Sequence, residues 1–113
     1  MTMAASDPKS RELIQTVSQI SNSLMNEVSK VIIGKQENLR RIQVGILSNG
    51  NMLIEGFPGL AKTLMANTFA TALGCKFKRV QFTPDLLPAD IMGTYMYDQH
   101  AGEFKLRPGP LFT

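Results

Sequence analysis

Residues 55–63 read Glu-Gly-Phe-Pro-Gly-Leu-Ala-Lys-Thr. This stretch fits the phosphate-loop pattern G-x-x-x-x-G-K-[ST], except that Ala61 stands where the second glycine is usual. Residues 51–54 before it are typical of a short buried strand, and residues 64–73 after it are typical of a helix that ends at Gly74. A loop of this kind between a strand and a helix predicts a binding site for a nucleoside triphosphate.

The residue types of the loop suit this chemistry. A loop that wraps back toward a helix start aims several backbone N–H groups at one point, and the helix dipole adds to the attraction for an anion. Gly56 and Gly59 allow a tight turn and a close approach of the phosphates, while Pro58 restricts the loop. Lys62 is expected to place its ammonium between the outer phosphates, and Thr63 is expected to offer its hydroxyl to Mg²⁺. The alternative interpretation is an ordinary turn with a solvated lysine.

The sign of the backbone angle φ at Ala61 is a specific question, because alanine replaces the usual glycine there. An alanine with positive φ would cost roughly 1–2 kcal/mol. We therefore predict that Ala61 is right-handed and already belongs to the first turn of the helix, where its methyl group is harmless. A positive φ at this residue would contradict the prediction.

The composition is that of an ordinary globular domain, since 43% of the 113 residues are hydrophobic and 19% are charged. The longest apolar runs are far shorter than the ~20 residues of a membrane span, and residues 1–8 lack the basic start and apolar segment of a signal peptide. A net charge of +3 is too weak to indicate nucleic-acid binding. The single cysteine, Cys75, is interpreted as a small apolar residue entering a buried strand, and it predicts a reducing compartment, by default the cytoplasm.

Two helices are expected before the loop. Ser6-Asp7-Pro8 offers a capping acid and a proline suited to the first helical position. An amphipathic helix of more than about five turns then follows, and Gly34 is expected to end it. A second helix is predicted over residues 36–47, before the turn signal Asn49-Gly50. The residues expected to face inward are Leu13, Val17, Ile20, Leu24, Val28 and Val31 in the first helix, and Leu39, Ile42, Ile46 and Leu47 in the second.

Beyond Gly74, residues 76–82 alternate loosely and predict a second strand. Residues 83–93 suggest a capped, broken helical segment that starts at Thr83-Pro84. Its two acids, Asp85 and Asp90, are interpreted as cap or turn acids in preference to catalytic carboxylates.

Residues 95–97 and 103–106 flank a five-residue loop that contains glycine, which predicts a β-hairpin. His100 is expected at the exposed tip of this hairpin. No further histidines or partner cysteines exist in the sequence to complete a metal site around it.

Six blocks of the chain, in their order along the sequence, resemble the start of the ATPase domain of MoxR-type AAA+ proteins. The similarity covers roughly residues 28–113, and the block at residues 82–94 is much more specific for the family than the phosphate loop. The blocks are residues 31–34, 56–63, 81–94, 97–98, 102–104 and 107–110.

The resemblance implies an α/β fold of the P-loop NTPase (AAA+) class, with a parallel sheet flanked by helices. It divides the chain into an N-terminal amphipathic helix at residues 1–30 and the first part of an AAA+ ATPase domain at residues 31–113, with a hairpin insert at about residues 95–106. The strand with the Walker B acids, the sensor residues, the arginine finger and the C-terminal lid are not in the sequence. We therefore expect an incomplete sheet, marginal stability and no hydrolysis by the 113-residue chain alone.

The resemblance also implies the residues of the site. Ile32, Ile33 and Gly34 would lie near the adenine, Lys62 would be the catalytic residue, and Thr63 would bind the metal ion. The residues expected to contact ATP in the loop and the following helix are Gly56, Pro58, Gly59, Leu60, Ala61, Lys62, Thr63 and Leu64.

The family's usual role is ATP-driven, chaperone-like remodelling of client proteins or metal-cofactor assembly. Its members generally act as hexameric rings, commonly beside partners with von Willebrand factor A domains. The implied ligands are ATP or ADP and Mg²⁺, with no nucleic acid and no membrane span. Two alternatives are a nucleotide-dependent interaction module that does not hydrolyse ATP, and another phosphate-loop enzyme such as a small-molecule kinase, against which residues 82–94 argue. The client protein, the ring size and the partner are beyond the sequence.

Overall fold

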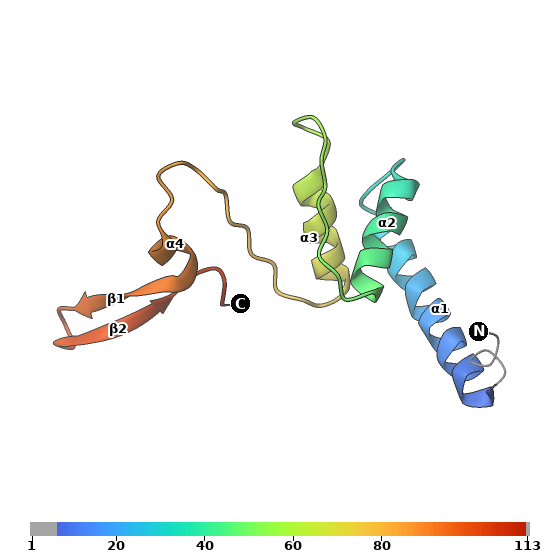
Figure 1. Cartoon of the computed structure of the whole chain (residues 1–113), viewed down its shortest axis with the longest axis horizontal. Coiled ribbons are helices and arrows are strands. Elements are labelled where there is room, and N and C mark those ends of the chain that lie inside the picture. Colours follow the sequence, from blue (N-terminus) through green and yellow to red (C-terminus); the bar gives the residue numbers. More distant parts are fainter. Residues whose placement is uncertain (1–6, 113) are drawn as a thin grey trace. The chain divides into compact units, whose positions relative to one another are not determined.

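The structure, a computed structural model, describes residues 7–112 of the chain. The chain forms two compact units, one up to Cys75 and the other from Lys76 onward. Expectations that concern residues 1–6, including Ser6 and the signal-peptide region, lie outside the described residues. Across residues 7–112, no helix combines the length and the apolar character required to cross a membrane. The elements are α1 (Pro8–Ser29), α2 (Gln36–Leu47), α3 (Lys62–Ala72), α4 (Pro88–Met92), β1 (Gly93–Asp98) and β2 (Glu103–Pro108) (Figure 1).

α1 begins at the predicted cap and ends earlier than predicted. Asp7 is the N-cap residue, and its carboxylate accepts a hydrogen bond from the Lys9 N–H at 3.3 Å. The helix ends at Ser29, so the expectation that Gly34 ends it is wrong. The Lys30 N–H donates to the carbonyl oxygens of Glu27 and Val28. These short-range bonds tighten the last turn and end the helix before Gly34.

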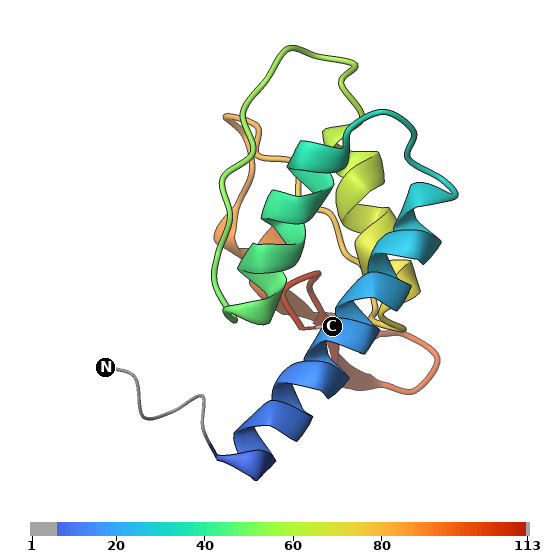
Figure 2. The same ribbon diagram turned by 90° about the vertical axis from the view of Figure 1, so that its right-hand side faces the viewer.

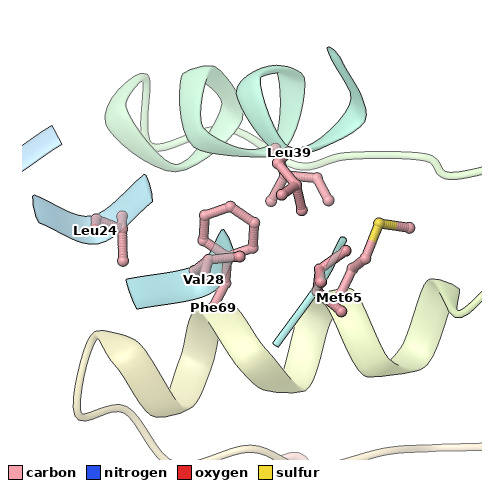
Figure 3. Packing of buried hydrophobic residues seen from close by; sticks show 7 residues of the cluster. Leu24, Val28, Leu39, Met65 and Phe69 are labelled. Carbon is pink, nitrogen blue, oxygen red and sulfur yellow. The ribbon is translucent and has the colours of Figure 1, made fainter. Parts of the chain in front are cut away.

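The core of the first unit lies where α1, α2 and α3 meet, and α1 packs against both of the other helices (Figure 2). Figure 3 shows the buried side chains of the three helices converging on this space. A polar contact supports the packing, because the Gln43 amide of α2 donates to the Ser21 carbonyl of α1 at 2.6 Å. The buried hydrophobic residues are Leu24, Val28, Ile32, Leu39, Ile42, Met65 and Phe69.

Only the C-terminal half of α1 buries its apolar face. α1 has 22 residues and is about 33 Å long, whereas α2 and α3 have 12 and 11 residues and are about half that length. The shorter helices therefore cannot cover the first turns of α1, where Leu13, Val17 and Ile20 are between 45% and 59% exposed. The residues wrongly predicted to be buried are Leu13, Val17, Ile20 and Val31, together with Leu47 of α2.

Neither strand predicted beside the phosphate loop and its helix is formed. Residues 51–54 and 76–82 have no regular secondary structure, Leu53 is 86% exposed, and Cys75, which was expected to enter a buried strand, is also exposed. A strand requires neighbouring backbone to pair with its N–H and C=O groups. Within the described part of the chain, the only sheet is the antiparallel pair β1–β2, so the expected parallel sheet is not present there.

α4 starts later than predicted. Thr83 and Pro84 were expected to begin a helix, but the chain forms a turn there, closed by a hydrogen bond from the Leu86 N–H to the Thr83 carbonyl at 3.1 Å. The helix begins at Pro88, where proline suits the first helical position because no N–H partner is needed.

The two acids of this segment lie in a turn and at a helix cap, as predicted. The Asp90 carboxylate accepts a hydrogen bond from the Leu87 N–H at 2.9 Å and so caps the start of α4. A hydrogen bond from the Thr83 side chain lowers the pKa of Asp85 in the preceding turn.

The hairpin is confirmed, with Tyr95 opposite Leu106 and Tyr97 opposite Phe104. The rings of Tyr97 and Phe104 are in contact, with their planes inclined at 59° and their centroids 5.2 Å apart. His100 is exposed in the loop, as expected. One face of this two-stranded sheet is therefore aromatic and apolar, since side chains at alternate positions share a face.

Candidate functional site: the loop before α3

The phosphate loop leads directly into α3, which begins at Lys62. The first helical hydrogen bond runs from the Met65 N–H to the Ala61 carbonyl at 2.9 Å, so the three N–H groups of residues 62–64 come before it and have no acceptor within the helix. α3 has no acidic residue in its first turn and no side-chain capping hydrogen bond. This helix end therefore presents backbone donors and the positive end of the dipole, and its first turn carries no carboxylate to compete for an anion.

Ala61 is left-handed, with φ 60° and ψ 25°, so our prediction of a right-handed residue is wrong. It is the N-cap residue of α3, which means that its own dihedral angles lie outside the helix although its carbonyl accepts the first helical hydrogen bond. Gly59, two residues earlier, also has a positive φ, of 81°. The chain reverses direction between the loop and the helix through these two left-handed residues. Alanine in this conformation costs roughly 1–2 kcal/mol, which the usual glycine would avoid.

Lys62 lies across the loop. Its ammonium nitrogen donates hydrogen bonds to the carbonyl oxygen of Gly56 at 2.6 Å and to that of Phe57 at 2.9 Å. An ammonium group has three donors, so one is left for a further acceptor. Thr63 follows on the first turn of α3 with an exposed side chain, which leaves its hydroxyl accessible from solvent.

A second lysine, which was not among the predicted site residues, contacts the loop. The ammonium of Lys35 donates a hydrogen bond to the carbonyl oxygen of Leu60 at 2.6 Å. Lys35 is the N-cap residue of α2 and directly follows the segment Ile32-Ile33-Gly34 that was assigned to the adenine. Its place after that segment was the only signal in the sequence, because the contact joins residues 25 positions apart.

The three residues assigned to the adenine have different surroundings. Ile32 is only 4% exposed and belongs to the core, whereas Ile33 is 86% exposed. Gly34 has a φ of 81°, which a residue with a side chain would adopt only under strain. Ile32 therefore anchors this connection, and Ile33 and Gly34 are the residues that a ligand can reach. The other apolar residues assigned to the site, Leu60 and Leu64, are exposed.

A cavity of about 270 Å³ lies between α2, residues 52–55 and the start of α3. It reaches the first residue of the loop stretch, Glu55, but neither Lys62 nor Thr63 lines it. This cavity is therefore distinct from the place where the loop donors gather. Within residues 7–112, no group of three or more His, Cys, Asp and Glu side chains is arranged to hold a metal ion.

Comparisons with known proteins identify the family of this chain. Residues 51–113 match the model of the ATPase family associated with various cellular activities (AAA). The chain is 49% identical over 85 residues to Chaperone MoxR1 of Mycobacterium tuberculosis, covering 75% of this chain and 22% of that protein. It is 30% identical over 86 residues to Protein MoxR of Methylorubrum extorquens, covering 75% of this chain and 24% of the relative.

A solved structure is also similar. The crystal structure at 2.00 Å resolution of a protein assigned as an ATPase from Cytophaga hutchinsonii matches with a TM-score of 0.71 and 40% identity, over 94% of this chain and 33% of that chain. The chain thus spans about a quarter to a third of the length of the proteins that it matches. The matched family model covers more than half of the chain and includes the phosphate loop and the hairpin. The chain therefore belongs to the AAA family of ATPases, and within that family it is of the MoxR type.

Proposed function

We propose that residues 56–63 bind the phosphates of Mg-ATP, and that the whole protein hydrolyses ATP to drive chaperone-like remodelling of client proteins or metal-cofactor assembly. The observation that carries this proposal is the position of Lys62. Its ammonium bridges two carbonyl oxygens of the loop at the start of a helix whose first turn carries no acid. Positive charge, a helix N-terminus and a glycine-containing loop thus meet at one place, which is the arrangement that phosphates require.

Lys62 would bind the outer phosphates through its remaining donor. A hydrogen bond between an ammonium and a phosphate oxygen is charge-assisted and contributes about 1.5–3 kcal/mol. The two carbonyl contacts hold the side chain over the loop, so little further side-chain entropy is lost when the phosphate binds. The backbone N–H groups of residues 62–64 would add donors from the first turn of α3.

Thr63 would hold Mg²⁺ together with the nucleotide. Mg²⁺ at nucleotide sites typically takes one or two protein ligands and completes its shell with phosphate oxygens and water. The exposed Thr63 hydroxyl, next to Lys62 on the first turn of α3, fits such a shared site. When bound, Mg²⁺ neutralises charge that develops on the phosphates. Ile33 and Gly34 would contact the adenine, with Ile32 fixing their position from the core.

The remaining parts of the proposal concern the whole protein. A hexameric ring, a partner with a von Willebrand factor A domain and a cytoplasmic location are predictions from the family resemblance and from the single cysteine. Large apolar side chains that are more than 80% exposed and have no role in the proposed adenine contact, namely those of Leu53 and Phe57, support the expectation that this chain packs against further protein.

The test is equilibrium binding of a fluorescent ATP analogue with Mg²⁺ to the 113-residue chain and to Lys62→Ala. Loss of a charge-assisted phosphate contact is expected to weaken binding at least about tenfold. Lys30→Ala is the matched control, because Lys30 is an exposed lysine directly after α1 whose ion-pair partner, Glu27, lies in the last turn of that helix and not in the loop. An affinity for the analogue that is the same in Lys62→Ala and in the unaltered chain would defeat the proposal.

A further inference from the structure

We infer that Lys35 is a positioning residue of the proposed nucleotide site, and that it acts through the peptide bond between Leu60 and Ala61. The inference rests on the proposed function and concerns the shape of the loop before α3. Lys35 reaches the loop from the connection between α1 and α2, and its ammonium holds the Leu60 carbonyl oxygen at 2.6 Å. This contact is shorter than the usual range of N–H···O bonds, and a charged donor shortens such bonds.

The contact restrains the strained residue of the loop. The described residues contain no cis peptide bond, and in a planar trans peptide the C=O and the following N–H point in opposite directions. Rotation of the peptide plane between Leu60 and Ala61 changes ψ of Leu60 and φ of Ala61 together. By holding the Leu60 oxygen, Lys35 therefore holds φ of Ala61 at 60° and turns the Ala61 N–H away from itself.

An alanine with this φ needs such a restraint. Left-handed non-glycine residues persist only where surrounding contacts hold them in place. Glycine adopts positive φ about as readily as negative φ, so a glycine at this position would keep the loop shape without help. Lys35 and Ala61 thus form a linked pair, in which the lysine supports a conformation that the alanine disfavours.

The restraint matters for phosphate binding because it decides which group of the peptide faces the ligand. With the Leu60 oxygen held by Lys35, the Ala61 N–H points to the opposite side of the peptide, where we expect it to join the N–H groups of residues 62–64 as a donor to phosphate. If Lys35 were lost, the peptide plane could rotate and present the Leu60 carbonyl oxygen, which repels a phosphate. A lysine that merely attracted phosphate by its charge would act in the same way whatever residue stood at position 61.

A double-mutant cycle separates these two roles. Binding of the fluorescent ATP analogue with Mg²⁺ is measured on the 113-residue chain, on Lys35→Met, on Ala61→Gly and on the variant with both changes. We expect Lys35→Met to weaken binding about tenfold when alanine is present, and about twofold or less in the Ala61→Gly background. Lys35→Arg is expected to retain most of the affinity, and Lys30→Met is the control for loss of one positive charge.

A second readout does not depend on the nucleotide. The backbone chemical shifts of Ala61 report its φ, and Lys35→Met is expected to move them from left-handed toward right-handed values. Equal losses of affinity from Lys35→Met in both backgrounds would overturn the inference, as would unchanged Ala61 shifts. If Lys62→Ala lowers the affinity and Lys35→Met does not, the inference fails and the proposed function stands. If Lys62→Ala leaves the affinity unchanged, the proposed function fails. The positioning role of Lys35 then fails too, because it depends on the nucleotide site.

Discussion

The ammonium nitrogen of Lys62 lies 2.6 Å from the carbonyl oxygen of Gly56, so the lysine of the phosphate-loop motif is bonded to the first glycine of the same motif. Gly56 and Lys62 are six residues apart in the sequence, and the Lys62 side chain links the start of the loop to the start of α3. With Lys35 bonded to Leu60, two lysines bind carbonyl oxygens of one short loop. The geometry concentrates positive charge where backbone donors of a helix end are available, which explains why this sequence pattern suits phosphates.

Ala61→Gly is expected to stabilise the chain by up to about 1 kcal/mol. The change removes roughly 1–2 kcal/mol of strain at positive φ, and the greater flexibility of glycine in the unfolded chain offsets part of that gain. Urea unfolding followed by helical circular dichroism measures the difference. Ala70→Gly, within α3, is the matched control and should destabilise the chain by about 1 kcal/mol, because it weakens a regular helix. Destabilisation by Ala61→Gly would contradict the strain argument.

Leu39→Ala is expected to destabilise the first unit by about 2–5 kcal/mol. Leu39 is fully buried between the helices, so its removal loses apolar contacts and leaves a cavity. Leu13→Ala makes the same chemical change on α1 at an exposed position and should alter the free energy of unfolding by about 0.5 kcal/mol or less. Chemical denaturation of both variants provides the comparison. Similar losses in the two variants would mean that the first turns of α1 are covered in solution.

Gly109→Ala is expected to disrupt the junction between α4 and the hairpin. A Cβ atom at Gly109 would lie 2.2 Å from the carbonyl oxygen of Ile91 and 2.6 Å from the backbone nitrogen of Gly93, and neither backbone atom can move independently. Overpacking of this kind typically costs about 1–3 kcal/mol. Amide hydrogen exchange across β1 and β2 would detect the loss. Gly102→Ala serves as the comparison, because a Cβ there meets no neighbouring atom and adds only the strain of a positive φ.

The hairpin is expected to weaken at acidic pH. The Lys105 ammonium, followed by the N–H groups of Ala101 and His100, lowers the pKa of Asp98. Since the folded pKa lies below the unfolded value of about 3.9, the stabilisation is present above that value and is lost as the pH falls through the folded pKa. The ring-proton signals of Tyr97 should therefore shift toward unfolded values in strong acid.

Asp98→Asn provides the control for this titration. The asparagine cannot lose a charge, so its variant should show a weaker hairpin at neutral pH and little further change on acidification. If the Tyr97 signals of the unaltered chain are the same at neutral and at strongly acidic pH, the Asp98 carboxylate does not stabilise the hairpin.

Much of the local structure could be predicted because it depends on neighbouring residues. The bounds of α2 agree with its periodicity, the N-cap of α1 is the predicted Asp7, and the hairpin forms around the predicted loop. The strands at residues 51–54 and 76–82 could not be predicted in the same way. Their apolar patterns are typical of strands, but a strand forms only where another strand pairs with it. Within residues 7–112 no strand pairs with either segment.

In the phosphate loop, too, some features follow from the sequence and others only from the tertiary structure. The sequence by itself determined the motif, the helix that follows it and the residues that we propose to bind a phosphate, because these depend on residue type and on short-range spacing. Only the tertiary structure decided that Ala61 is left-handed and that Lys35 holds the Leu60 carbonyl. It also decided which part of α1 is buried, since that depends on the lengths of the helices packed against it. A backbone angle can be held away from its intrinsic preference by a contact from a distant segment, and such a contact exists only once the helices have packed.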